Sequence, residues 1–363
     1  MKFIGFKINT ANLQRRISIL CSIYRVKNAF SLIQKEKVIF ATIMMVYLLF
    51  VIGFVCLIKG ADWLVVGSAT VAKKNNISDL VVGLTIVSMG TSMPELVVNL
   101  LASSKGASQI AIGNIIGSNI ANILLILGVT SLIYPVEIKK STLSYEIPYS
   151  IFALLIVVFV TNTTLFDSTK NTIGHFDGII LLLFFGLFVS YIIKLARAGR
   201  GELIDDIPAT DLSNSKAAIF ILLGTCGLFL GGQWVIEGAV AIATSIGLSE
   251  TFVGLTIVAI GTSLPELVTS AVAAYRKKTD IAVANVIGSN IFNLLWVLGI
   301  SAMVHPLQFD DLINTDMLIL LGASCLIFIS VVSKHPKNQI GKPTGALFML
   351  SYVGYILFLV WRG

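Results

Sequence analysis

Charged residues are scarce in this chain of 363 residues. Asp, Glu, Lys and Arg make up 12% of the sequence, whereas hydrophobic residues make up 56%. A soluble globular domain carries about twice this share of charge, so the composition excludes an ordinary soluble protein. The mean hydropathy of +0.91 and several apolar runs long enough to cross a bilayer indicate a polytopic membrane protein. The short alternating segments of a transmembrane β-barrel are missing, so the expected fold is all-α.

Cysteine and histidine are also rare. The four cysteines have no Cys-x-x-Cys spacing, and the three histidines fall at predicted loops or helix ends. This distribution argues against a disulfide framework and against a metal site built on thiolate or imidazole. A net charge of +7 is explained in a membrane protein by basic loops that set the orientation. We therefore expect no nucleic-acid partner, no obligate protein partner and no cofactor; the surroundings are the lipid bilayer.

One segment of the chain occurs twice, at a constant offset of 171 residues. Residues 81–129 and 252–300 align without a gap, and 26 of the 49 positions are identical, which indicates a duplication. The similarity continues upstream, where Trp63 pairs with Trp234. Each copy contains Gly-Thr-Ser-x-Pro-Glu within an apolar segment, which places a carboxylate at membrane depth. A duplicated apolar unit with an intramembrane ionisable residue is typical of secondary transporters.

The apolar runs predict ten membrane spans, five in each copy. A first repeat occupies residues 44–194, a linker 195–215 and a second repeat 216–363. Because five is odd, the second copy enters the membrane from the opposite side. The predicted fold is therefore two inverted five-helix repeats with broken helices at the midplane. The predicted spans are 44–72, 78–103, 107–133, 146–162, 175–194, 216–246, 250–275, 280–304, 314–333 and 345–361.

The basic residues predict the orientation of these spans. The loops after the odd-numbered spans hold fourteen Lys and Arg residues, and the opposite loops with the C-terminus hold three. The positive-inside rule then places the first set of loops, including the linker, in the cytoplasm. Residues 1–43 form a basic extension with eight basic residues and one acidic residue, which this orientation puts on the outer side. We expect this extension to lie outside the working transporter, with Met44 or Met45 as a candidate start.

The repeated motif supplies a set of oxygen ligands. Pro94 and Pro265 each remove a backbone hydrogen bond and interrupt their helix, and irregular backbone at bilayer depth is tolerated where it lines a cavity or is buried in protein. The next span of each copy adds Ser and Asn four residues apart, on one helix face. Asn119 and Asn290 lie about 100° away around the helix and are expected to cap or bridge helices. The candidate ligands are Glu95, Glu266, Thr91, Thr262, Ser92, Ser263, Ser118, Ser289, Asn122 and Asn293.

Ligands of this kind suit hard cations such as Ca²⁺ and Na⁺. Inverted repeats would bring them around a common centre, where two carboxylates match one Ca²⁺ or two or more Na⁺. Without a cation, two buried carboxylates would tend to take up protons, so a proton is an expected competitor. Each feature alone has a structural explanation, such as a proline kink or a hydroxyl bonded to its own helix. Duplication of the whole set favours an ion site.

The motifs GTSMPE and GTSLPE, followed by GNIIGSNIAN and ANVIGSNIFN, resemble the two alpha-repeats of the cation/calcium antiporter superfamily, in particular of its prokaryotic sodium/calcium exchangers. The resemblance covers the chain from about residue 44 onward. It implies a ten-helix fold in the inner membrane of a prokaryotic cell, with several cation sites at the midplane. It also implies alternating access, in which the long first and sixth helices slide across a bundle formed by the other helices.

The resemblance also assigns roles to individual residues. The expected ligands of a central Ca²⁺ site are the carboxylates of Glu95 and Glu266, completed by Thr91 and Thr262 and flanked by Asn122 and Asn293. The expected ligands of two Na⁺ sites are, nearer one face, Ser92, Ser118 and the Ser88 carbonyl, and, nearer the other, Ser263, Ser289 and the Ala259 carbonyl.

Departures from the family pattern refine the expected coupling ion. Some members, including potassium-dependent exchangers, carry Asp at the position of Asn293, so this chain is expected not to depend on K⁺. The proton-coupled branch usually carries Glu and His where this chain has Gly-Ser-Asn. We therefore interpret the sequence as a secondary antiporter, not an enzyme, that exchanges Ca²⁺ for Na⁺. A proton-coupled antiporter of Ca²⁺ or another divalent cation is the alternative, and a passive cation channel is a more distant one.

Overall fold

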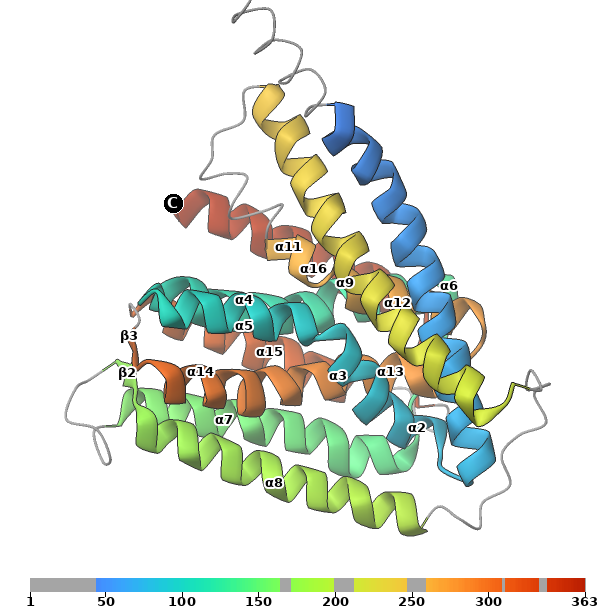
Figure 1. Cartoon of the computed structure of the whole chain (residues 1–363). Coiled ribbons are helices and arrows are strands. Elements are labelled where there is room, and N and C mark those ends of the chain that lie inside the picture. Colours follow the sequence, from blue (N-terminus) through green and yellow to red (C-terminus); the bar gives the residue numbers. More distant parts are fainter. Residues whose placement is uncertain are drawn as a thin grey trace, which may run out of the picture. The chain divides into compact units, whose positions relative to one another are not determined.

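A computed structural model describes residues 44–163, 171–198, 212–246, 259–308, 311–332 and 338–362. The chain divides into two compact units, Met1–Leu49 and Phe50–Gly363, and both copies of the duplicated segment lie in the second. The predicted basic extension, residues 1–43, and most of the predicted linker lie outside the described residues. The described part of the second unit is helical apart from four two-residue strands (Figure 1), so the all-α prediction is confirmed.

Eight helices within the described residues are long and apolar enough to cross a membrane. A bent pair, Asp79–Thr91 with Met93–Ser104, makes a ninth span with 46° between its halves. The predicted span 250–275 is described from Ala259 onward. The eight helices are Met44–Asn75, Ser108–Ile133, Thr142–Asn162, His175–Ala198, Asn214–Ile242, Thr279–Val304, Leu312–Val332 and Lys342–Arg362. The chain is therefore an integral membrane protein.

Several of these spans are built from shorter elements. In the first repeat they are α2 (Asp79–Val82), η1 (Gly83–Val87), α3 (Ser88–Thr91), α4 (Met93–Ser104), α5 (Ser108–Ala121), η2 (Asn122–Ile126), α6 (Leu127–Ile133), η3 (Thr142–Glu146), α7 (Ile147–Asn162) and α8 (His175–Ala198). In the second repeat they are α9 (Asn214–Ser245), α11 (Ala259–Thr262), α12 (Leu264–Tyr275), α13 (Thr279–Ile291), η6 (Phe292–Val297), α14 (Leu298–Val304), α15 (Leu312–Val332) and α16 (Lys342–Arg362). The elements labelled η are π-helical turns.

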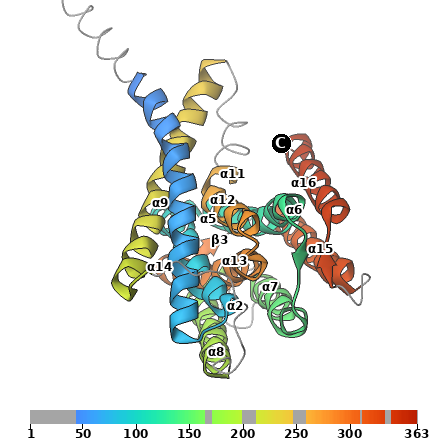
Figure 2. The same ribbon diagram turned by 90° about the vertical axis from the view of Figure 1, so that its right-hand side faces the viewer.

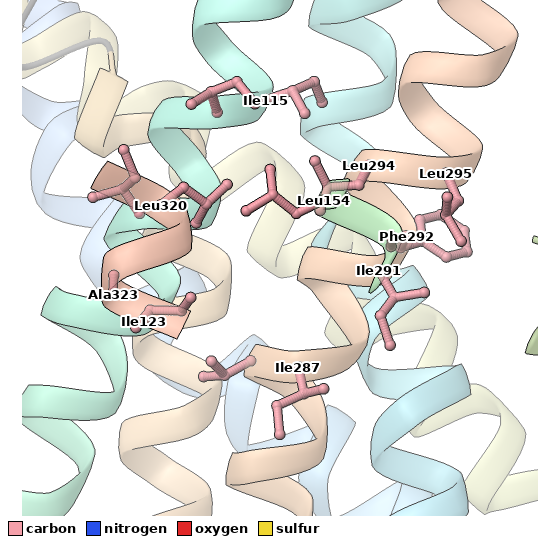
Figure 3. Packing of buried hydrophobic residues seen from close by; sticks show 14 of the residues in the cluster. Ile115, Ile123, Leu154, Ile287, Ile291, Phe292, Leu294, Leu295, Leu320 and Ala323 are labelled. Carbon is pink, nitrogen blue, oxygen red and sulfur yellow. The ribbon is translucent and has the colours of Figure 1, made fainter. Parts of the chain in front are cut away.

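Two related spans form the centre of the second unit. The spans Ser108–Ile133 and Thr279–Val304 are 72% and 94% buried, whereas the other six helices are 17–39% buried. In Figure 2, α13 lies among α2, α7 and α12. Apolar side chains of α13 pack together with those of α5, α7 and α15. Examples are Ile115, Leu154, Ile287 and Leu320 (Figure 3). The spans that carry Gly-Ser-Asn are thus shielded from lipid by the rest of the bundle.

From Phe50 onward, the helix Met44–Asn75 packs against α9 through glycines (Figure 1). A Cβ added at Gly60 would lie 2.8 Å from the carbonyl oxygen of Gly224, and one added at Gly231 would lie 2.7 Å from that of Gly53. Small residues allow such backbone-to-backbone contact between membrane helices. Leu57 and Leu228 of this pair belong to a second hydrophobic cluster, which also contains Val82, Ala273 and Ile281 of neighbouring helices.

Two small antiparallel sheets connect the repeats. Strand β1 (Val136–Glu137) pairs with β4 (Gln339–Ile340), and β2 (Thr172–Ile173) pairs with β3 (Leu307–Gln308). Strands β1 and β3 each follow the third span of their repeat, and β2 and β4 each precede the fifth span. In both sheets, a strand that follows the third span of one repeat therefore pairs with a strand that precedes the fifth span of the other. Because β1 and β2 lie at opposite ends of the span Thr142–Asn162, the sheets lie on opposite sides of the membrane, as inverted repeats require. Strands of two residues have no sequence pattern, so these were not predicted.

Candidate cation site

The two predicted helix breaks have the same local structure. Ser92 separates α3 from α4 with φ −87° and ψ 8°, and Ser263 separates α11 from α12 with φ −89° and ψ 6°. Pro94 and Pro265 lie in the first turn of the second half-helix, where a missing N–H is tolerated because it has no partner within the helix. Each proline therefore begins a new helix, and each glutamate lies in the first turn after the break.

Both glutamates are buried within the bundle and lie near each other. Glu95 is 1% exposed and Glu266 is fully buried, and Ser92, three residues before Glu95, contacts Glu266. The hydroxyl of Ser92 donates a hydrogen bond of 2.8 Å to Oε1 of Glu266. No described residue donates to either carboxylate oxygen of Glu95 or to Oε2 of Glu266. Buried anionic oxygens without donors are costly unless a positive charge reaches them.

The serine hydroxyls pair across the two repeats. Oγ of Ser92 lies 3.0 Å from Oγ of Ser289 on α13. Their counterparts at the 171-residue offset are Ser263 and Ser118, whose hydroxyls are buried and have no hydrogen-bond partner among the described residues. Ser92 thus contacts Ser289 and Glu266 of the other repeat, and the two Na⁺ sets expected from the resemblance stay a prediction. These contacts between the repeats arise because the first half of each broken helix reaches the other repeat: α3 contacts α13, and α11 contacts α5.

Four asparagines form a two-fold network where α5 and η2 meet α13 and η6. Asn122 donates to Oδ1 of Asn290 at 2.9 Å, and Asn293 donates to Oδ1 of Asn119 at 3.1 Å. Asn119 and Asn290 each donate to the other's backbone carbonyl, at 3.2 and 3.4 Å, so the predicted bridging of helices is confirmed for this pair. The amide oxygens of Asn122 and Asn293 remain without a described donor and are available to a cation.

The π-helical turns at these asparagines were not predicted. Asn122 is the first residue of η2 and Asn293 the second of η6. Such turns insert an extra residue into a helix and are frequent at functional sites. Their sequences, Asn-Ile-Leu-Leu-Ile and Phe-Asn-Leu-Leu-Trp-Val, contain no breaker that would distinguish them from ordinary α-helix.

The threonines of the motif also make contacts across the repeats. Thr91 donates to Oδ1 of Asn285 at 3.0 Å, and Thr262 donates to Oδ1 of Asn114 at 3.1 Å. Asn114 and Asn285 were not among the predicted ligands. The signal that identifies them is their retention in both copies, as the Asn of GNIIGSN and of ANVIGSN.

The two expected backbone ligands lie before the breaks. The carbonyl oxygen of Ser88 accepts the backbone N–H of Ser92 at 3.0 Å and lies 3.3 Å from the hydroxyl oxygen of Thr91. Because the single proton of that hydroxyl is donated to the nearer oxygen of Asn285, one lone pair of the Ser88 carbonyl remains for a cation. Ala259 is the first residue of α11.

Seven buried oxygens of the candidate site are without a donor among the described residues, and both repeats contribute to them. Their mixture of carboxylate, amide and hydroxyl groups is the ligand chemistry of Ca²⁺ and Na⁺. No cluster of three or more His, Cys, Asp or Glu residues occurs in the described part of the chain. The seven atoms are Oε1 and Oε2 of Glu95, Oε2 of Glu266, Oγ of Ser118 and Ser263, and Oδ1 of Asn122 and Asn293.

Comparison with known proteins gives a consistent result. The family model "Sodium/calcium exchanger protein" matches residues 45–194 and 216–361. The putative antiporter CaxA of Alkalimonas amylolytica is 34% identical over 322 residues, which cover 86% of this chain and 98% of that protein. The sodium/calcium exchanger MaX1 of Methanosarcina acetivorans is 32% identical over 347 residues, with coverages of 86% and 98%. A structure of the sodium-calcium exchanger NCX_Mj, soaked with Na⁺ and Ca²⁺, superposes with a TM-score of 0.72 at 31% identity, covering 86% of this chain and 98% of that one.

Proposed function

Because the chain belongs to the sodium/calcium exchanger protein family, we propose that it is a secondary antiporter that exchanges Ca²⁺ for Na⁺ by alternating access. The observation that carries the proposal is that Glu95 and Glu266, from opposite repeats, are both buried among oxygens that lack donors, with Ser92 of the first repeat in contact with Glu266. Proteins of this transporter family are not enzymes, and the chemistry of the site is that of binding and release.

The proposed ligand roles follow the contacts in one half of the site and the 171-residue offset in the other. Glu95 and Glu266 bind Ca²⁺ centrally, with Thr91 and Thr262 beside them and Asn122 and Asn293 flanking. A Na⁺ site in one half uses Ser92, Ser289 and Glu266, which lie in contact; the other uses the counterparts Ser263, Ser118 and Glu95. The carbonyls of Ser88 and Ala259 complete these sites nearer the two faces.

Two carboxylates in the bundle explain why transport is coupled. An uncompensated pair of charges is costly at membrane depth, so the site changes its exposure only when Ca²⁺ or Na⁺ neutralises it. A passive channel would instead need a continuous pore lined by rings of ligands. The resemblance to the family favours Na⁺ over K⁺ or H⁺ as the coupling ion, because this chain has Asn293 and Gly-Ser-Asn where potassium-dependent and proton-coupled members carry acidic residues or histidine.

The proposed location is the inner membrane of a prokaryotic cell, with the inter-repeat linker in the cytoplasm. The excess of basic loops on the linker side supports this orientation. On that side, basic residues of the loops form ion pairs with helix ends, such as Lys139 with Asp280 and Lys278 with Asp79, both at 2.8 Å. Na⁺ moving inward would then expel Ca²⁺.

The test is ⁴⁵Ca²⁺ uptake into proteoliposomes loaded with Na⁺, K⁺ or protons in turn. We expect uptake that requires internal Na⁺. Glu95→Gln and Glu266→Gln remove charges that pair with the cation, so each should lower uptake by about a hundredfold or more. Glu237→Gln on α9, where the glutamate is exposed, is the matched control and should transport normally.

Three results would count against this function. Uptake without counter-transported Na⁺ would indicate a channel. Uptake driven by a proton gradient alone would support the proton-coupled alternative. Full activity in a correctly folded Glu95→Gln or Glu266→Gln protein would remove the two glutamates from the transport site.

A further inference from the structure

Each broken helix is held at its break by an asparagine of the other repeat. Thr91 is the last residue of α3 and Thr262 the last of α11, and each precedes its glutamate by four residues. The hydroxyl of Thr91 donates to Asn285 on α13, and that of Thr262 donates to Asn114 on α5, at 3.0 and 3.1 Å. Thr91 and Thr262 are equivalent at the 171-residue offset, as are Asn114 and Asn285, so these contacts are a two-fold-related pair.

Asn285 touches both broken helices at once. Besides accepting from Thr91, it donates to Oγ of Ser270 at 2.9 Å and to the backbone carbonyl of Glu266 at 3.4 Å. Asn285 is fully buried. It therefore connects the end of α3, one turn before Glu95, to the first turn of α12, which carries Glu266. The side chain of Asn285 therefore fixes the positions of the two broken helices relative to each other.

Asn114 makes a similar but more open set of contacts. Its amide nitrogen donates to Oδ1 of Asn99 at 2.8 Å, and Asn99 in turn donates to the carbonyl of Ala111 at 3.0 Å. Asn114 is only partly buried, and its hydrogen bond to α4 goes to the side chain of Asn99 and not to the backbone of Glu95. We therefore expect the Asn285 contact to matter more than its counterpart.

We propose that Asn285 and Asn114 are positioning residues of the transport site, which act on the cation through Thr91 and Thr262. An amide oxygen can only accept a hydrogen bond, whereas a hydroxyl has one proton and two lone pairs. At Thr91 the asparagine therefore accepts the hydroxyl proton, and the hydroxyl oxygen turns its lone pairs away from that bond, where a cation can bind them.

The same contact fixes the backbone at the break. The last carbonyls of a helix have no partner within the helix, and in transporters such unwound ends coordinate cations. Thr91 and Thr262 end their half-helices, so the bond to asparagine determines where these carbonyls lie. The inference rests on the proposed exchange function and adds two residues that do not touch the cation themselves.

The test is a double-mutant cycle on the apparent Ca²⁺ affinity of Na⁺-driven uptake. Asn285→Leu keeps the approximate volume and removes the acceptor. We expect it to raise the KM for Ca²⁺ about tenfold, the effect of one lost positioned ligand. In a Thr91→Val background, which already lacks the hydroxyl, Asn285→Leu should add little. In a Thr91→Ser background, which keeps the hydroxyl, it should raise the KM as in the parent protein.

Ser270→Ala is the matched control, because it removes a partner of Asn285 but leaves the bond to Thr91. It should change the KM less than Asn285→Leu does. The proposal is overturned if Asn285→Leu leaves the KM unchanged. It is also overturned if the effects of Thr91→Val and Asn285→Leu on the KM multiply in the double variant. A purely structural role would lower protein yield and maximal rate in every background without the dependence on the Thr91 hydroxyl.

A second cycle guards against failure of the first. If Asn285→Leu does not fold, Asn114→Leu with Thr262→Val tests the related contact, with a smaller expected rise in KM and the same loss of effect in the valine background. Stabilisation of the purified protein by Ca²⁺ on heating measures binding without transport. If the parent protein shows no Na⁺-driven uptake, the proposed function is rejected. If the parent protein exchanges normally and the asparagine variants have the same KM for Ca²⁺, only the positioning role is rejected.

Discussion

The buried oxygens of Glu95 and Glu266 make protons the natural competitors of Ca²⁺. A carboxylate in a buried site without donors is stabilised either by a metal cation or by a proton, and both must occupy the same oxygens. Acidification is therefore expected to weaken apparent Ca²⁺ binding, by up to about tenfold per pH unit for each proton displaced. At high Ca²⁺ the maximal rate should be restored.

The measurement is the KM for Ca²⁺ as a function of pH on the side of uptake. Glu146 supplies a matched control, since it is a fully buried acid of η3 hydrogen-bonded to Tyr191 rather than placed at the site. Glu146→Gln should leave the pH dependence of the KM unchanged. A fall in maximal rate with an unaltered KM would show that protons act somewhere other than the cation ligands.

Among single residues, the candidate ligands could be proposed from the sequence, whereas the asparagines that contact them could not. Carboxylates and hydroxyls at a repeated proline stand out because polar groups are costly in lipid. Asn114 and Asn285 lie on helix faces where an asparagine has many structural explanations, and their role depends on which helix lies opposite. That opposite helix belongs to the other repeat, so no local pattern in the sequence identifies the contact.

At the scale of helices, the crossing of Met44–Asn75 and α9 depends on glycine. A Cβ at Gly60 would lie 2.8 Å from the carbonyl oxygen of Gly224 and 2.9 Å from the backbone nitrogen of Leu228. Backbone atoms cannot move aside as a flexible side chain can, so Gly60→Ala must push the helices apart. Overpacking of this kind costs about 1–3 kcal/mol. We expect Gly60→Ala to have a lower melting temperature in detergent and slower exchange, although Gly60 is not one of the candidate cation ligands.

Gly186→Ala on α8 is the control for this change, because a Cβ there meets no described atom within 4 Å. Alanine also has the higher helix propensity, so this variant should be as stable as the parent protein or slightly more so. Equal melting temperatures for Gly60→Ala and Gly186→Ala would mean that the close crossing is not required for stability.

The helices were predictable to different degrees. The broken helices follow from proline and from the duplication, because one motif with one local structure must appear twice. The π-helical turns and the two-residue strands have no comparable signal. They arise where the repeats meet, as at Asn122 in η2 and at the pairing of β1 with β4, and are set by tertiary contacts rather than by local propensity.

For the molecule as a whole, the two repeats are equivalent in fold but not in charge. Asp62 on the first described helix forms an ion pair with Arg276, which follows α12. Their counterparts at the 171-residue offset are Gln233 and Lys105, and Gln233 donates instead to Glu237 at 3.0 Å. In an inverted-repeat transporter, the second end state arises when the repeats exchange conformations. The ion pair stabilises the conformation described and has no equivalent in the exchanged one.

Breaking this pair should therefore shift the balance between the two end states. The side chains are 31% and 43% exposed, and partly exposed pairs are worth less than about 1 kcal/mol, so the shift should stay below about fivefold. Arg276→Gln and Asp62→Asn should change the ratio of apparent Ca²⁺ affinities on the two sides of the membrane by the same factor. The double variant should go no further, and about 1 M salt, which screens exposed charges, should reproduce the effect in the parent protein. Lys105→Gln is the control, because Lys105 is the equivalent of Arg276 but the equivalent of Asp62 is the neutral Gln233. An equal shift in that variant would show that net charge, not the ion pair, sets the balance.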